Sequence, residues 1–133
     1  MIQIHQGVDL VELPKFKSVF LNHKSFVSDI YTEKEREYCL TQRDPAIHFA
    51  GRFAVKEAFL KAIGRGISGS GIDHIFQEIE VSQHASGKPV LSVSGWAAKI
   101  SRRMNINQFT VSISHASSYA IATVILVGSK NTV

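Results

Sequence analysis

The part of the chain with the clearest chemical potential is the stretch 45–63, where charged side chains lie among apolar ones. Asp44-Pro45 is typical of a helix start, and Gly64 is a natural helix end. A helix that is apolar on nearly all sides is expected at the centre of a domain. Unpartnered charges would cost several kcal/mol each there. The charged residues are therefore expected to face solvent, pair with each other, or line a cavity that holds an ion or a charged ligand: Arg52, Lys56, Glu57 and Lys61.

Two interpretations of Glu57 and Lys61 remain open from their spacing. Four residues apart on a helix, they could form an ion pair worth about 0.2–0.5 kcal/mol. Alternatively, Glu57 could be a metal ligand and Lys61 a contact to a phosphate or leaving group. Mg²⁺ commonly bridges a few carboxylates to a substrate phosphate, which requires a second carboxylate. Asp9, after the Gly7 turn, is a candidate, although an Asp at this position could also be the N-cap of the first helix.

The periodicity of apolar residues predicts one α+β domain over residues 1–133, with a mostly antiparallel sheet packed on the long central helix. The capping box Thr32-Glu33-Lys34-Glu35 predicts a helix to about Thr41. The glycine-rich stretch 64–71 and the last residues, 129–133, are expected to be a loop and a loose tail. The other expected helices cover 13–21, 45–63 and 96–104, and the expected strands cover 2–8, 75–82, 89–93, 109–114 and 119–127.

Composition narrows the class of protein. The chain has 133 residues, of which 44% are hydrophobic and 20% charged, so it can bury a core. Its first residues lack the basic start and the apolar block of a signal peptide, and no apolar run is long enough for a membrane helix. Its single cysteine excludes an internal disulfide or a multi-cysteine zinc site. The net charge of +4 comes from scattered basic residues, without the basic stripe and aromatic platforms of a nucleic-acid-binding domain. We expect a cytoplasmic protein that binds neither membrane nor nucleic acid.

Four segments, in this order and spacing, resemble holo-acyl-carrier-protein synthase, the small stand-alone type of the 4′-phosphopantetheinyl transferase superfamily. The middle segment, with its Arg-Phe-x-x-Lys-Glu-x-x-x-Lys pattern, is the most specific. The resemblance spans essentially the whole chain and is carried by residues 7–13, 51–64, 87–89 and 112–115.

The resemblance implies transfer of the phosphopantetheine arm of coenzyme A to a serine of acyl carrier protein, which releases adenosine 3′,5′-bisphosphate and supports fatty acid biosynthesis. It implies a Mg²⁺ site with Asp9 and Glu57 as ligands, and places Lys61 beside the leaving phosphate. The general base remains open between a metal-bound water and Glu57. The residues that would contact or border the nucleotide are Arg52, Gly64, Arg65, Gly66, Lys88, Pro89 and His115.

The resemblance also implies a homotrimer with active sites between subunits, and an acidic carrier that docks on the first helix near Lys15, Phe16 and Phe20. Two positions depart from the family pattern. His5 stands where the family often has the first glycine of Gly-x-Gly-x-Asp, and Arg65 where a small hydroxylated residue is common. These departures concern details of nucleotide binding and leave the implied metal ligands in place.

Other classes of function fit the residues less well. The stretch 64–71 follows a helix and lacks Gly-Lys-Ser/Thr, so it is not a phosphate-binding loop of an ATPase. Cys39 is interpreted as a small buried hydrophobe rather than a nucleophile. A binding module for coenzyme A or a carrier protein could retain Arg52 and the first helix without turnover. The presence of Asp9, Glu57 and Lys61 together favours an active transferase.

Overall fold

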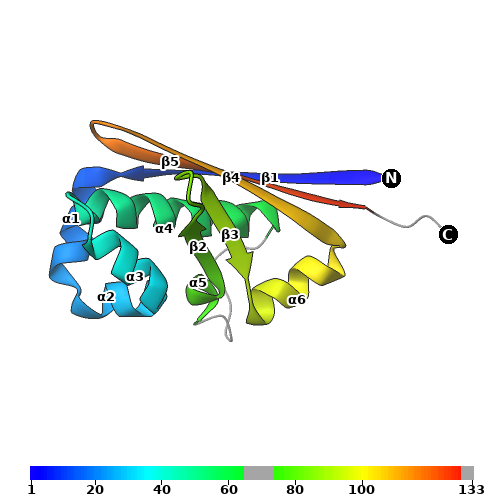
Figure 1. Cartoon of the computed structure of the whole chain (residues 1–133), viewed down its shortest axis with the longest axis horizontal. Coiled ribbons are helices and arrows are strands. Elements are labelled where there is room, and N and C mark those ends of the chain that lie inside the picture. The colour runs from blue at the N-terminus through cyan, green and yellow to red at the C-terminus, as the bar shows by residue number, and fades with distance from the viewer. Residues whose placement is uncertain (65–73, 130–133) are drawn as a thin grey trace.

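The computed structural model describes residues 1–64 and 74–129, and its elements form two layers (Figure 1). A three-stranded sheet makes one layer, and the helices with a separate hairpin make the other. This is the expected α+β architecture, with antiparallel pairing in both sheets. In chain order the elements are β1 (Ile2–Glu12), α1 (Leu13–Asn22), α2 (Lys24–Ile30), α3 (Glu33–Leu40), α4 (Pro45–Ala62), α5 (Ile75–Glu78), β2 (Ile79–Gln83), β3 (Pro89–Val93), α6 (Gly95–Arg103), β4 (Ile106–Ala116) and β5 (Tyr119–Ser129).

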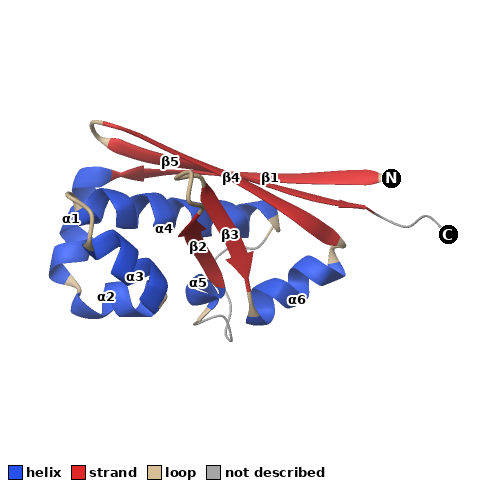
Figure 2. Cartoon of the chain, viewed as in Figure 1, coloured by secondary structure: helices blue, strands red, loops and turns tan. Residues whose placement is uncertain are grey.

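The large sheet has the order β1-β5-β4, so the last strand of the chain lies between the first strand and β4. β1 pairs with β5 along its whole length, from Ile2 opposite Ser129 to Glu12 opposite Tyr119. All helices lie on one side of this sheet, and the described chain leaves the other face uncovered (Figure 2). That outer face presents large exposed apolar side chains along β1 and the adjoining half of β5: Ile2, Ile4, Val8, Leu10, Tyr119 and Ile121.

The long helix α4 is the centre of the molecule, as its apolar sequence predicts. It packs against the inner face of the sheet, and most of its residues are buried. β1 can approach it closely because Gly7 faces the helix without a side chain. A Cβ on Gly7 would overlap the carbonyl oxygen of Ala58 and lie 2.9 Å from the backbone nitrogen of Ala62. The glycine therefore sets the distance between the strand that carries Asp9 and the helix that carries Glu57.

We predict that Gly7→Ala forces β1 away from α4, because the atoms it would meet belong to helix backbone and cannot move aside independently. The free energy of unfolding should fall by about 1–3 kcal/mol, the usual range for overpacking a well-filled site. Chemical denaturation measures this loss, with Gln6→Ala on the exposed side of the same strand as the control. A Gly7→Ala variant as stable as Gln6→Ala would contradict the close packing.

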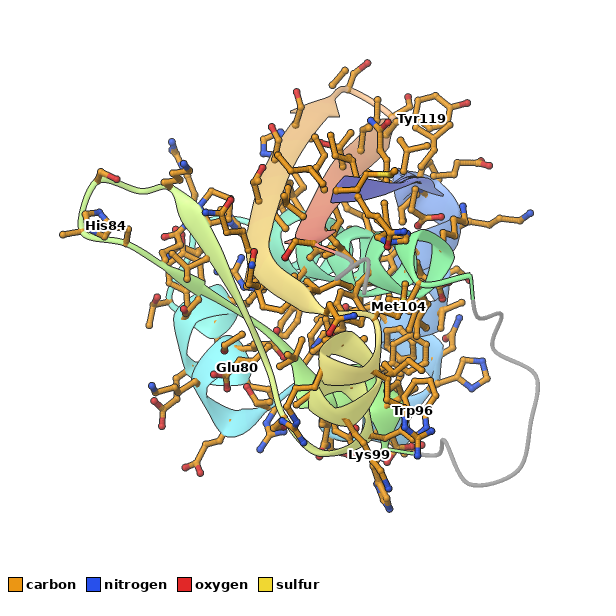
Figure 3. All side chains as sticks on the ribbon, turned by 90° about the vertical axis from the view of Figure 1, so that its right-hand side faces the viewer. Glu80, His84, Trp96, Lys99, Met104 and Tyr119 are labelled. Atoms are coloured by element: carbon orange, nitrogen blue, oxygen red, sulfur yellow. The ribbon has the colours of Figure 1, made fainter. Side chains whose placement is uncertain are left out.

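The smaller sheet is the hairpin β2–β3, which lies on the helical side of the molecule. His84 stands at its tip, where the hairpin projects from the body (Figure 3). The base of the hairpin is held by a buried charge. Lys56 Nζ of α4 donates hydrogen bonds to the carbonyl oxygens of Phe76 and Ile79, each at 2.6 Å, and lies 2.8 Å from Glu35 Oε1 of α3. Helices α3 and α4 are thus joined to the start of β2 by one ammonium group.

Several elements match the sequence-based expectations. Both reciprocal hydrogen bonds of the capping box at Thr32 and Glu35 are present, and Gly64 follows α4 with φ of +75°. Asp44 precedes α4 without a side-chain capping bond, and its carboxylate lies 3.8 Å from Lys17 instead. Cys39 is fully buried, in agreement with its interpretation as a small hydrophobe.

Other expectations are corrected by the structure. The strands at both ends of the chain are longer than predicted, because partners across the sheet extend them beyond their alternating segments. Asp9 therefore lies inside β1 rather than after a turn, and its alternative as an N-cap is wrong. The segment 75–82 begins with the short helix α5 before it becomes a strand, and α2 was not expected. The predicted loop 65–71 and tail 130–133 lie outside the described residues.

Candidate functional site

One group of functional side chains lies where β1 crosses α4. Asp9 is on the inward-facing side of β1, and Glu57 and Lys61 are one turn apart on α4. Lys61 Nζ lies 2.9 Å from Asp9 Oδ1 and donates a second hydrogen bond to the carbonyl oxygen of Val8 at 3.1 Å. The ion pair of Lys61 is therefore with Asp9, on another element, and the interpretation as a Glu57–Lys61 pair is replaced.

The second carboxylate of this group, Glu57, has an unusual environment. It is half-buried, and burial together with the nearby charge of Asp9 raises its pKa, while Lys61 opposes that rise. Two carboxylates that repel each other, one of them paired with an ammonium group, suit a hard divalent cation. In the part of the chain that the structure describes, no cluster of three or more metal-binding side chains occurs. A cation here would take its remaining ligands from water and substrate, as Mg²⁺ commonly does at phosphates.

A largely apolar groove of about 430 Å³ opens directly beside these carboxylates. Asp9 and Glu57 line it together with Lys15 of α1. Its remaining lining residues come from β1, α1, α2 and α4: Leu10, Val11, Glu12, Phe16, Val19, Phe26 and Phe53. The two carboxylates are therefore part of the lining of an apolar groove.

The structure corrects the role expected of Phe16 on the surface of α1. Phe16 is 6% exposed, and its ring contacts those of Phe20, Phe26 and Phe53. Phe20 is half-buried against Phe49. The apolar residues of α1 whose spacing suggested a docking face, Phe16 and Phe20, therefore lie mainly on the core-facing side of the helix. Lys15 is exposed as expected, and the open apolar side chains of α1 are Val19 and Leu21.

A second group of predicted residues lines a separate pocket of about 150 Å³. Arg52 of α4, His115 of β4 and Pro89 of β3 meet there. Arg52 is 3% exposed, and its Cζ lies 4.3 Å from the centre of the Tyr38 ring. The other lining residues carry no carboxylate: Ile47, His48, Gly51, Gln83, Gly87 and Ile113. A buried guanidinium in a pocket without carboxylates is an environment for an anion.

The two groups face different directions from the same helix. Arg52 and Glu57 are five residues apart, which turns their side chains by about 140° around the helix axis. No residue lines both cavities. Lys88 lies in a third depression with His84 and Phe109, Gly64 is exposed at the end of α4, and Arg65 and Gly66 lie outside the described residues.

Comparison with known proteins decides the family. The model of the 4′-phosphopantetheinyl transferase superfamily matches residues 6–124. The chain belongs to this superfamily. It is 41% identical to a holo-[acyl-carrier-protein] synthase of Syntrophus aciditrophicus over 94% of this chain and 96% of the relative, and 44% identical to one of Halalkalibacterium halodurans over 92% and 94%. Its fold matches the solved complex of a Chronobacterium ammoniagenes synthase with coenzyme A, with a TM-score of 0.82, 31% identity and coverage of 96% and 99%.

The 4′-phosphopantetheinyl transferase fold was expected from the sequence, and the comparisons confirm it. Analysis of the sequence missed the Lys56–Glu35 pair, because its partners are 21 residues apart and Glu35 was interpreted only through its capping box. It also missed His48, which belongs to no motif. His48 lines the second pocket because the start of α4 lies beside β4 in the fold. Among the described residues, no helix is both long and apolar enough to cross a membrane.

Proposed function

We propose that this chain transfers the 4′-phosphopantetheine group of coenzyme A to a serine of apo acyl carrier protein, yielding holo-acyl carrier protein and adenosine 3′,5′-bisphosphate. The observation that carries this proposal is the meeting of Asp9, Glu57 and Lys61 at one crossing of strand and helix, in a chain of this superfamily. The names of the relatives and the coenzyme A complex of a structural neighbour support it. A supply of carrier protein for fatty acid synthesis, in the cytoplasm, is part of the proposal.

The proposed chemistry follows from the charges at this site. The serine oxygen forms a bond to the phosphorus that carries the pantetheine and gives its proton to a base, either Glu57 or a water molecule, and the bond from that phosphorus to the oxygen of the nucleotide phosphate breaks. Negative charge then grows on the leaving phosphate, and Lys61 is placed to offset it or donate a proton. Asp9 and Glu57 would hold Mg²⁺, which supplies Lewis-acid stabilisation of phosphate oxygens. Before substrate binds, Lys61 neutralises the charge of Asp9 through the ion pair between them.

This function is tested by product release. When the reaction mixture is separated by chromatography, adenosine 3′,5′-bisphosphate should appear only if the protein, coenzyme A, apo carrier and Mg²⁺ were all present. Omission of the carrier is the control, because a hydrolase would release the bisphosphate without an acceptor. Release that is independent of the carrier would contradict the assignment as a transferase.

We predict that Lys61→Ala lowers turnover more than it weakens coenzyme A binding, because the leaving phosphate gains charge only as the bond breaks. A decrease in kcat of about 10²–10³-fold is expected for the loss of one such group. Steady-state kinetics separates the two effects, with Lys99→Ala on the exposed face of α6 as the control (Figure 3). A rise in KM at unchanged kcat would assign Lys61 to ground-state binding instead.

We further propose that the protein is a homotrimer whose active sites lie between subunits. Two observations support this. The outer face of the β1-β5-β4 sheet leaves large apolar side chains exposed, including Ile2 at 72% and Ile4 at 67%, and an apolar face of this kind gains free energy when another chain covers it. In addition, the pocket of Arg52 and the group of Glu57 face different directions on one chain. Contact between copies would allow the Arg52 pocket of one chain to serve the carboxylates of another.

Complementation between inactive variants tests the shared site. Glu57→Gln lacks the metal side of the site and Arg52→Gln the nucleotide side. A statistical mixture of equal amounts restores both sides in about one quarter of the sites if they come from neighbouring subunits, so about a quarter of the wild-type activity should return. The two variants are refolded together, and each variant refolded alone is the control. Light scattering measures the oligomeric state of each sample. A mixture no more active than its two components would contradict a site shared between chains.

The carrier is proposed to approach along α1, beside the groove that Asp9 and Glu57 help to line. Lys15 borders this groove and is exposed, which suits an acidic partner. Lys17, also on α1, is partly engaged by Asp44. Lys15→Glu should therefore raise the KM for the carrier more than Lys17→Glu does, while the KM for coenzyme A stays unchanged.

A further inference from the structure

His48 occupies a position that the proposed function leaves without a task. It lies in the first turns of α4, half-buried, with its ring in an edge contact to Tyr38 at 6.0 Å between centroids. It lines the 150 Å³ pocket together with Arg52, one turn further along the helix, and His115 from β4. Three side chains that are cationic or can be protonated, from two elements, therefore border one small cavity.

The cavity is built for negative charge. The guanidinium of Arg52 is buried, and its Nε has no hydrogen-bond partner among the described residues. A buried cationic group without an acceptor is costly, and an anion that enters the cavity would remove that cost. The pocket lining contains no Asp or Glu, so nothing in it opposes an anion.

We propose that His48 is a third ligand of the phosphate that Arg52 and His115 bind, and that its imidazole takes up a proton when this phosphate arrives. This inference rests on the proposed function, because it assumes that the pocket receives a phosphate of the nucleotide. His48 would then determine how strongly nucleotide affinity depends on pH. It would be a specificity-determining residue that no motif marks.

The charged surroundings of His48 support a proton uptake of this kind. Burial lowers the pKa of His48, and electrostatic repulsion from Arg52 and His115 lowers it further, while Asp44 before the helix opposes them. The imidazole is therefore neutral in the empty pocket at neutral pH. Tyr38 contributes only an edge contact between the two rings, and Gln83 from β2 is uncharged. A phosphate dianion beside the imidazole reverses the balance and raises its pKa, so affinity should fall as pH rises.

Calorimetric titration with adenosine 3′,5′-bisphosphate tests the proposal, because this probe requires neither carrier nor turnover. Titrations in buffers of different ionisation enthalpy count the protons taken up. His48→Gln keeps a hydrogen-bonding side chain but cannot be protonated, so uptake should fall by up to about one proton. Affinity at about pH 6.5 should fall about tenfold, the effect of one charge-assisted hydrogen bond, and the loss should shrink toward pH 8.5. His23→Gln, exposed between α1 and α2, is the matched control.

A second variant keeps the proposal falsifiable if His48→Gln is poorly folded. His48→Lys carries a permanent charge, so it should bind the bisphosphate with an affinity that depends less on pH than that of the wild type. Wild-type affinity and proton uptake in His48→Gln would overturn the role of His48 and leave the proposed function standing. Failure of the wild-type protein to bind the bisphosphate would overturn the nucleotide site itself, and the proposal about His48 with it.

Discussion

Glu57→Gln should lower the rate of phosphopantetheine transfer by at least about 100-fold at limiting Mg²⁺, because a metal ligand that acts on transferring phosphates contributes several kcal/mol. The amide keeps the size of the side chain but loses the charge that attracts a divalent cation. Mn²⁺ binding, measured by electron paramagnetic resonance, should weaken in parallel. Glu12→Gln is the matched control, because Glu12 lines the same groove on the exposed side of β1.

The same substitution should leave the fold intact and even raise its stability. Burial and the charge of Asp9 raise the pKa of Glu57, so the ionised form opposes folding above the pKa of the unfolded chain. Removal of that charge should therefore raise the melting temperature at neutral pH. The gain should vanish at acid pH, below the ordinary range of a carboxyl group, because Glu57 is then protonated in both states. Near-normal turnover at limiting Mg²⁺, or a cooperative loss of structure in Glu57→Gln, would contradict its assignment as a ligand.

Lys56→Met should destabilise the protein by about 3–5 kcal/mol, because it leaves the carboxylate of Glu35 buried without its cation. Both side chains are fully buried, and burial lowers the pKa of Lys56, an effect that Glu35 opposes. The carboxylate of Glu35 would retain only the backbone N–H groups of Thr32 and Val81 as donors. Denaturant titration measures the loss, with Lys99→Met on exposed α6 as the control.

The double variant Lys56→Met/Glu35→Gln separates the buried charge from the packing of this region. It removes both charges and keeps one amide oxygen, which can accept from Thr32 or from Val81 but not from both, because these N–H groups donate to different oxygens of Glu35. Part of the lost stability should therefore return. Recovery should be incomplete, because the carbonyl oxygens of Phe76 and Ile79 lose their shared donor. If the double variant is as unstable as the sum of the two single variants, the electrostatic explanation is wrong.

The buried pair of Lys56 and Glu35 also illustrates what could and could not be predicted from the sequence alone. The apolar periodicity of α4 and the caps at Thr32 and Gly64 are local signals, and the structure confirms the elements they predict. The partner of Lys56 is set by tertiary packing, and a local pattern does not contain it. The lengths of β1 and β5 likewise depend on their pairing across the sheet, since each extends the other beyond its alternating segment.

The candidate site was predicted in part. Asp9, Glu57 and Lys61 were named from the family motifs, and the structure brings them to one crossing of strand and helix. The ion pair between Asp9 and Lys61 was not predicted, because it requires the inward orientation of Asp9 within β1. The separation of Arg52 from Glu57 could have been inferred from their spacing on a helix. The contribution of His48 could not be inferred from the sequence, because only the fold places β4 beside the start of α4.

The intact mass of an apo acyl carrier protein after incubation with this protein, coenzyme A and Mg²⁺ tests the central claim most directly. The proposed function predicts a mass gain of one phosphopantetheine group. The gain should disappear with EDTA and with a carrier whose acceptor serine is replaced by alanine. A carrier that remains unmodified by folded, coenzyme A-binding protein would contradict the claim and indicate a binding module without turnover.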